Sequence, residues 1–180
     1  LRPRMASGHL QGQLLRMLTG MIRPKVVVEI GTYSGYSALS MAAGMTADAV
    51  LHTFEINDEQ EVFTRPWLEG SPYPPRIVLH IGEVEKLLPP MNLSIDLAFI
   101  DANKRQYVDY YNLLMPFIAP GGYILADNTL WDGHVIDPAY DRDAQTRGIR
   151  AFNDLVRDDE RVEKVILPLR DGLSLIRKIG

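Results

Sequence analysis

Two short stretches in the second half of the chain carry the residue types of a divalent-cation site. Asp101 lies in FIDANKRQY (residues 99–107), and Asp127 and Asn128 end LADN (residues 125–128). Two carboxylates and one amide oxygen are hard ligands, which suit Mg²⁺, Ca²⁺ or Mn²⁺ better than zinc or copper. Such residues at strand ends also cap loops. Their occurrence after two consecutive predicted strands favours a metal site.

Lys104 follows Asp101 by three residues and is the candidate catalytic base. A bound cation nearby disfavours the charged form of an amine. The lysine could then accept a proton at neutral pH. The alternative is a solvated surface lysine, which is the commonest environment of this residue type.

A glycine turn early in the chain, EIGTYSG at residues 29–35, predicts a site for a small molecule. Gly31 and Gly35 allow a tight turn and a close approach of backbone to ligand. Hydroxyl side chains such as Ser37 fall at a predicted helix N-terminus, which attracts carboxylates or phosphates. Glu55 ends the next strand, where an acid can accept both hydroxyls of a ribose. Together these features indicate a nucleoside-containing cofactor.

Two details of this turn favour S-adenosylmethionine over a dinucleotide. The G-x-G-x-x-G fingerprint is absent, because Tyr33 stands where the second glycine would be. Glu29, an acid just before the turn, would repel a pyrophosphate but suits the ammonium group of an amino acid. A plain strand-to-helix turn remains the alternative for this segment taken alone.

The elements that must position these residues alternate along the chain. Apolar runs predict strands at 26–30, 51–56, 76–82, 95–102 and 123–128, and two closing strands within 161–169 and 172–179 joined by the hairpin signal RDG. Helical spacing predicts helices at 10–22, 37–45, 58–68, 83–90, 107–117 and 145–157, with a turn at APGG, residues 119–122.

This alternation predicts an α/β fold: a doubly wound, mostly parallel seven-stranded sheet with helices on both faces and an antiparallel edge formed by the last two strands. Ligands in such sheets bind outside the carboxyl ends of the strands, where the candidate residues fall. The segment 129–143, with Gly133, Pro138 and four aspartates, is a predicted loop.

Composition restricts the function classes. A length of 180 residues fits one domain, 1–180, and the net charge of −4 does not favour a broad nucleic-acid surface. The absence of cysteine excludes disulfides and thiolate-bound zinc. We find no apolar run long enough for a membrane span and no signal-peptide pattern, so we expect a cytoplasmic protein. The chain opens LRPRMASG without an initiator methionine.

In these combined motifs the chain resembles the cation-dependent, S-adenosylmethionine-dependent O-methyltransferases. This family includes catechol O-methyltransferase, the plant caffeoyl-CoA O-methyltransferases and small bacterial relatives. The resemblance runs from about Met5 to Lys178 and rests on MASGHLQGQLL, EIGTYSGYSAL, FEIN, FIDANK, PGGYILADNTLW and RDGLSLIRK. It implies the Rossmann-like class I methyltransferase fold.

The resemblance also implies residue roles. The implied cofactor-binding residues are Met5, Ser7, Glu29, Gly31, Tyr33, Ser37, Glu55, Ile56, Gly82, Glu83, Val84 and Asp101. The implied metal ligands are Asp101, Asp127 and Asn128, with Mg²⁺ as the expected ion, and Lys104 is the implied catalytic base.

Three departures from the family pattern stand out. Asn103 replaces the second acid of the common D-A-D-K, and Gly82-Glu83-Val84 replaces G-D-A beside the adenine. The N-terminal helix that precedes the Met5 segment in relatives is expected to be missing. Loop 129–143 and the N-terminus are expected to shape the acceptor site.

The function that this implies is methyl transfer to a hydroxyl of a catechol-like or caffeoyl-type aromatic acceptor, by a homodimer without membrane attachment. A tRNA 5-hydroxyuridine O-methyltransferase is the alternative within the class. An NAD-dependent oxidoreductase and a cofactor-binding protein without catalysis are the alternatives from other classes.

Overall fold

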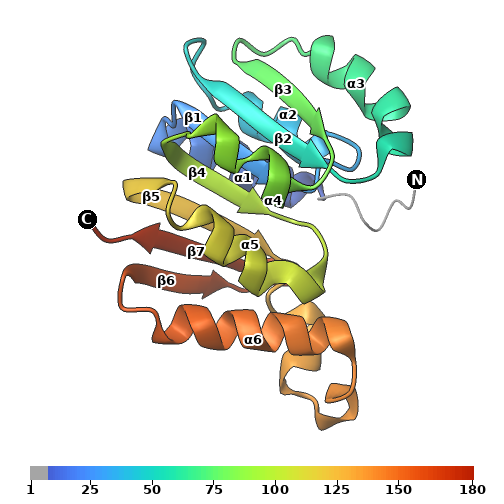
Figure 1. Cartoon of the computed structure of the whole chain (residues 1–180), viewed down its shortest axis with the longest axis vertical. Coiled ribbons are helices and arrows are strands. Elements are labelled where there is room, and N and C mark those ends of the chain that lie inside the picture. The colour runs from blue at the N-terminus through green and yellow to red at the C-terminus, as the bar shows by residue number, and fades with distance from the viewer. Residues whose placement is uncertain (1–7) are drawn as a thin grey trace. The chain divides into compact units, whose positions relative to one another are not determined.

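The computed structural model describes residues 8–180 and has the predicted α/β fold (Figure 1). Its seven-stranded sheet has the order β3-β2-β1-β4-β5-β7-β6. The strands are β1 Val26–Ile30, β2 Val50–Glu55, β3 Arg76–Ile81, β4 Ile95–Ile100, β5 Ile118–Asp127, β6 Val162–Leu167 and β7 Leu173–Lys178. The mostly parallel class with an antiparallel edge is confirmed, because β1 pairs parallel with β2, β2 parallel with β3, and β7 antiparallel with both β5 and β6.

The helices follow the predicted spacing to within a few residues. They are α1 His9–Ile22, α2 Tyr36–Ala42, α3 Glu61–Glu69, α4 Val84–Leu87, α5 Tyr107–Leu114 and α6 Ala144–Asp158. Short 3-10 turns are η2 Asp58–Gln60, η3 Pro89–Met91, η4 Lys104–Gln106, η5 Trp131–Ile136 and η6 Pro138–Tyr140. Within residues 8–180 no helix has the length and apolar character needed to cross a membrane.

The chain divides into two compact units at Ile95 and Asp96. The first contains β1, β2 and β3, and its core includes the fully buried Val27 and Val28 of β1. In this unit α1 packs closely on the segment after α2. A Cβ on Gly44 would lie 2.1 Å from the carbonyl oxygen of Arg16, so this contact requires glycine.

The second unit is built around the aromatic residues of α5 and α6. The rings of Tyr107 and Phe152 meet edge to face with centroids 5.4 Å apart, and both side chains are fully buried. Gly148 of α6 packs against η4, and a Cβ there would lie 2.3 Å from the carbonyl oxygen of Lys104. The close packing of α6 therefore fixes the backbone that carries the candidate base.

The start of β5 differs most from the prediction, since the strand was expected to begin at residue 123. Residues 119–122, APGG, are not a turn before the strand but part of β5, which begins at Ile118. Ile118 is buried, and Gly121 takes a left-handed φ of 78° within the strand. Gly122 sits so close to the neighbouring backbone that a Cβ would lie 3.1 Å from the carbonyl oxygen of Asp96. Burial and close backbone approach therefore override the local turn signal.

Candidate active site

The carboxyl end of β1 carries Glu29, which is fully buried. Its two carboxylate oxygens accept hydrogen bonds from the hydroxyls of Ser37 and Thr53, each at 2.5 Å. Because Thr53 donates to Glu29, the hydroxyl of Thr32 is the donor in its 2.5 Å contact with Thr53. Glu29 therefore ties the start of α2 to β2. Its contact with a cofactor ammonium stays a prediction.

The glycine turn after β1 is left-handed at three positions. Gly31 has a φ of 101°, Tyr33 of 47° and Gly35 of 77°. A non-glycine residue in this region needs support from its surroundings. The N–H of Tyr33 donates to Glu55 Oε2 at 2.8 Å, and the hydroxyl of Thr64 donates to the Tyr33 carbonyl at 2.5 Å. Both backbone groups of Tyr33 are thus held in place.

Glu55, at the carboxyl end of β2, links two turns. Its Oε2 accepts the Tyr33 N–H, and its Oε1 accepts the N–H of Asn57 at 2.9 Å. A carboxylate oxygen has two lone pairs, so these contacts leave acceptor capacity on both oxygens. The carboxylate is therefore fixed in position and still able to receive two hydroxyl groups.

The predicted adenine residues differ in exposure. Ile56 directly follows β2 and is 72% exposed, which is an unusual position for an isoleucine. Gly82 has a φ of 136°, and its N–H donates to the Glu55 carbonyl at 2.8 Å. Glu83 precedes α4, and the side chain of Val84 is buried in the core. Ile56 alone among these residues offers exposed apolar surface. Met5 and Ser7 lie outside the described residues.

In the second unit Lys104 is buried, with 7% of its surface exposed, and is not a solvated surface lysine. Its Nζ donates to Asp101 Oδ1 at 2.8 Å and to the hydroxyl of Tyr107 at 2.7 Å. Asn103 caps η4 by accepting the N–H of Arg105 at 3.2 Å. The structure therefore brings the predicted base and one predicted metal ligand into direct contact.

Tyr107 is a site residue that the sequence reasoning missed. Its hydroxyl lies 2.9 Å from the Asp127 carbonyl and 3.3 Å from the Ile100 carbonyl, so it contacts the carboxyl ends of both β4 and β5. Burial, and then the carboxylates of Asp101 and Asp127, raise the pKa of Tyr107 well above its usual value. The hydroxyl therefore stays neutral. The available signal was its place three residues after Lys104, since such side chains lie on the same side of a 3-10 turn.

Asp127 and Asn128 follow one another at the end of β5. Asp127 is only 5% exposed, and its Oδ1 accepts the N–H of Asn128 at 2.8 Å. Asn128 has a left-handed φ of 60°. The carboxylates of Asp101 and Asp127 and the amide oxygen of Asn128 are the donor types that a divalent metal such as Mg²⁺ takes. Their binding of one common ion stays a prediction. Across residues 8–180 no cluster of three or more His, Cys, Asp or Glu side chains is placed to hold a metal; the predicted set has two carboxylates and an amide.

The seven-stranded sheet, with candidate residues at the carboxyl ends of its parallel strands, is that of the class I methyltransferases, as its solved neighbours bear out. A family model described as O-methyltransferase matches residues 2–179. The chain belongs to this O-methyltransferase family, which confirms the predicted fold class and enzyme class.

Curated relatives and solved structures agree with this assignment. Caffeoyl-CoA O-methyltransferase 2 from Zea mays is 34% identical over 94% of this chain and 68% of its own length. A putative O-methyltransferase from Klebsiella pneumoniae has a TM-score of 0.92 at 29% identity, covering 99% of this chain and 84% of that one. The O-methyltransferase TomG from Streptomyces achromogenes, involved in tomaymycin synthesis and solved with SAM, has a TM-score of 0.91 at 26% identity, covering 99% and 83%.

A third structure is that of an O-methyltransferase from Bacillus cereus in complex with SAH. It has a TM-score of 0.90 at 25% identity and covers 98% of this chain and 84% of that one.

Proposed function

We propose that this protein methylates a hydroxyl of a catechol-like or caffeoyl-type aromatic acceptor, with S-adenosylmethionine as methyl donor and a divalent cation, Mg²⁺ in the first place. The observation that carries the proposal is the buried Lys104, bonded to Asp101 and to Tyr107 at the ends of β4 and β5. The SAM and SAH complexes of two similar structures support the choice of cofactor. The caffeoyl-CoA O-methyltransferases among the relatives support an aromatic acceptor.

The first unit supplies the residues for cofactor binding. The pre-positioned carboxylate of Glu55 would accept the ribose hydroxyls, and the exposed Ile56 would be covered by the adenine. The S-adenosylmethionine would supply the activated methyl group. The left-handed turn at Tyr33 would bring backbone close to its methionine part.

The second unit supplies the residues that activate the acceptor. A free phenol has a pKa of about 10, so most of it is protonated at neutral pH. Asp101, Asp127 and Asn128 would hold a cation, whose charge would favour the oxyanion of the acceptor. Lys104 in its neutral form would take the proton at Nζ. The new ammonium would keep Asp101 and Tyr107 as partners, so the proton would be received without moving the side chain.

Acceptor identity depends on loop 129–143 and the N-terminus in this proposal. A tRNA hydroxyuridine is the second candidate; the net charge of −4 weighs against it. The family assignment weighs against an NAD-dependent oxidoreductase.

The resemblance to the O-methyltransferase family also leads us to propose one catalytic domain over residues 1–180 and a homodimer. Sedimentation of the purified protein would test the homodimer.

The deciding experiment measures transfer of labelled methyl from S-adenosylmethionine to catechol, caffeoyl-CoA and undermodified tRNA. Each assay is run with Mg²⁺, with EDTA, and with Mg²⁺ restored after EDTA. We expect turnover of an aromatic diol that stops in EDTA and returns with the metal. Full turnover in EDTA, with metal loss confirmed by elemental analysis, would refute the metal-dependent mechanism. Methyl transfer to tRNA and to neither aromatic compound would replace the proposed aromatic acceptor with a tRNA acceptor.

A further inference from the structure

The backbone that follows the candidate metal ligands has an uncommon conformation. After Asn128, the chain is left-handed at Trp131 with a φ of 49°, at Asp132 with 50° and at Gly133 with 78°. Glycine adopts this region freely, whereas tryptophan and aspartate do so at an energetic cost. Two such residues in succession persist only where the surroundings hold them, so the contacts of this segment are informative.

The first anchor of this segment is the turn between β6 and β7. The N–H of Thr129 donates to the Gly172 carbonyl at 3.0 Å, and the N–H of Leu130 donates to the Asp171 carbonyl at 2.9 Å. The N–H of Asp132 donates to the carboxylate of Asp171. Three N–H groups of the segment therefore donate to two residues of one turn that is distant in sequence. Asp171 accepts two of these hydrogen bonds, one at its carbonyl and one at its carboxylate.

The shape of the turn is fitted to the segment. Gly172 is buried and left-handed, with a φ of 85°, and a Cβ there would lie 2.7 Å from the Leu130 nitrogen and 2.5 Å from its Cγ. On β7, the hydroxyl of Ser174 donates to that of Thr129 at 2.9 Å. The RDG sequence therefore does more than close a hairpin, because its last two residues also support the segment after β5.

The second anchor is Arg150 of α6, which holds the remainder of the loop. Its guanidinium donates to the carbonyls of Val135 at 2.9 Å, His134 at 2.9 Å and Asp137 at 2.8 Å, and to Asp141 Oδ1 at 2.6 Å. Backbone carbonyls at three positions thus converge on one side chain. Such a cluster fixes a loop of irregular conformation far more firmly than surface ion pairs do.

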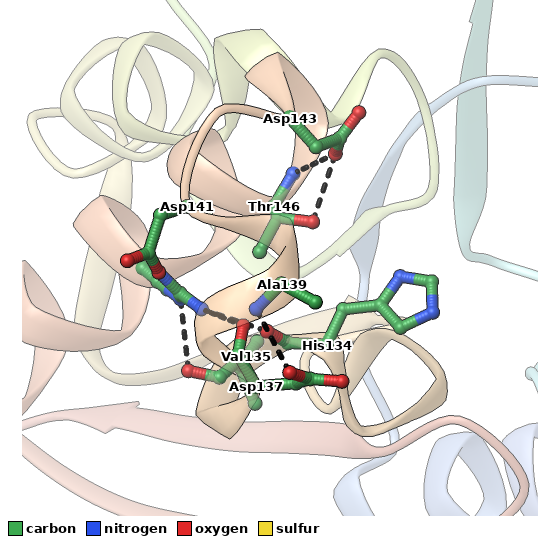
Figure 2. Close-up of polar contacts among 8 residues, drawn as sticks. His134, Val135, Asp137, Ala139, Asp141, Asp143 and Thr146 are labelled. Atoms are coloured by element: carbon green, nitrogen blue, oxygen red, sulfur yellow. Dashed lines mark hydrogen bonds and ion pairs between the residues drawn. The ribbon is translucent and has the colours of Figure 1, made fainter.

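Two local features complete this half of the loop. The rings of His134 and Tyr140 stack with centroids 3.5 Å apart. Asp143 caps α6 by accepting the N–H of Thr146 at 2.7 Å and its hydroxyl at 2.8 Å, as Figure 2 shows. The loop therefore ends in a fixed helix start, and it is held at both ends and in its middle.

We propose that Asp171 and Arg150 are positioning residues that hold loop 129–143 in one shape before the acceptor binds. The loop would then act as a rigid template for the acceptor and not as a lid that closes over it. This inference rests on the proposed function for its consequences in catalysis. A fixed wall beside the hydroxyl to be methylated lowers the cost of ordering the site and determines which of two neighbouring hydroxyls reacts.

The test in turnover compares D171A with D171N, and R150A with R150K. R157A is the matched control, because Arg157 lies on the same helix and pairs only at the surface, with Asp154 and Asp158. Loss of a charge-assisted hydrogen bond predicts a rise of about tenfold in the acceptor KM of D171A and R150A. In the same variants we expect a changed ratio of the two products methylated at one or the other of the neighbouring hydroxyls. The KM for S-adenosylmethionine is expected to stay within about twofold of the wild-type value.

The conservative variants D171N and R150K distinguish the loss of particular hydrogen bonds from the loss of side-chain volume. In D171N an amide oxygen can still accept the Asp132 N–H, so this variant is expected to retain most of the acceptor affinity. R150K keeps the charge but cannot reach several carbonyls at once, so it is expected to behave like R150A. Equal KM and isomer ratio in D171A, R150A and the wild type would overturn the proposal.

Amide hydrogen exchange tests the anchors without any turnover. In the wild type, peptides covering 128–137 are expected to exchange slowly, and in D171A at least about tenfold faster. Peptides from β1 to β3 should exchange at the same rate in D171A as in the wild type. All peptides of R157A should exchange at the wild-type rate. Fast exchange of this loop in the wild type, or equal exchange in D171A, would overturn the proposal. An inactive wild type with protected loop amides would instead contradict the proposed function and leave the anchors standing.

Discussion

The Nζ of Lys104 lies 2.7 Å from the hydroxyl of Tyr107, and both groups are buried. The hydroxyl accepts a hydrogen bond from the lysine and donates one to the Asp127 carbonyl, 2.9 Å away. One tyrosine thus orients the candidate base and joins it to the end of β5, where two candidate metal ligands follow one another. This arrangement makes Tyr107 part of the site although it has no proton to exchange at neutral pH.

Replacing Tyr107 by phenylalanine keeps the ring packing and removes this hydroxyl. We expect kcat to fall about tenfold, and the free energy of unfolding to drop by about 1–3 kcal/mol, because buried polar groups lose a partner. Steady-state kinetics and urea unfolding measure the two effects. Y110F is the control, because the Tyr110 hydroxyl donates to Gln106 Oε1 at 3.0 Å, a residue of η4. A Y107F enzyme with wild-type kcat would remove Tyr107 from the site.

Replacing Lys104 by methionine tests the base itself. Methionine fills a similar volume without a charge, so the fold should tolerate it in this buried position. Loss of general-base catalysis predicts a fall of about 100-fold or more in kcat. Calorimetry with S-adenosylhomocysteine is expected to give a Kd that changes much less than kcat, because Lys104 itself is not among the implied cofactor-binding residues. A Kd that weakens in step with kcat would mean that Lys104 supports binding.

Glu55 provides the corresponding test for the cofactor. In E55Q a single amide oxygen remains, so one of the N–H groups of Tyr33 and Asn57 loses its acceptor. We expect the Kd for S-adenosylhomocysteine to rise about tenfold, since a charged acceptor for hydroxyls becomes neutral. E59Q is the matched control, because Glu59 is exposed and accepts no hydrogen bond from the turn after β1. Equal calorimetric Kd values for E55Q and E59Q would contradict the ribose assignment.

The strand ends were predictable because they depend on local pattern. The β-branched run before Glu29 forms β1, and Glu55, Asp101 and Asp127 all fall at or directly after strand ends. The spacing of apolar residues locates such strands in the sequence. Once the strands are located, the residues at their carboxyl ends, where ligands bind in parallel sheets, are known as well. The resemblance to a family then supplied roles that the spacing alone left open.

The supporting residues were not predictable in the same way. Tyr107 contacts a carbonyl 20 positions away, and Asp171 accepts an N–H from 39 positions away. Hydrogen bonds over such separations follow from packing and have no signature in a single sequence. The APGG segment shows the converse, because its turn signal is local and the burial of Ile118 in β5 overrides it.

A pair of histidines on β2 and β3 predicts a pH dependence of stability. His52 Nδ1 lies 3.0 Å from His80 Nε2, and Phe54 stacks on His80. Burial lowers the pKa of His52 to about 4, helped by the positive charges of His80 and Arg76. The folded state therefore binds this proton less readily than the unfolded state does, and stability is expected to fall as pH drops from about 6.5 toward 4.

Urea unfolding at pH 7.5 and at pH 5 measures this effect. The variant H52F is expected to lose less stability than the wild type between the two values, because its side chain cannot bind a proton. H9Q is the control, since His9 is exposed at the start of α1. Parallel losses in H52F and the wild type would show that the acid sensitivity lies elsewhere.

Two helical glycines give a matched pair for the packing behind Lys104. A Cβ on Gly148 of α6 would lie 2.3 Å from the Lys104 carbonyl oxygen, whereas on Gly20 of α1 the nearest atom is 3.7 Å away. Alanine at position 20 fits and raises helix propensity, so G20A should gain up to about 1 kcal/mol.

Alanine at position 148 must push α6 away from η4, so G148A should lose about 1–3 kcal/mol. Because the Lys104 backbone moves with η4, kcat should also fall in G148A, while the Kd for S-adenosylhomocysteine stays unchanged. Urea unfolding, kinetics and calorimetry on both variants decide this. A G148A protein as stable and as active as G20A would show that the position of Lys104 does not depend on α6.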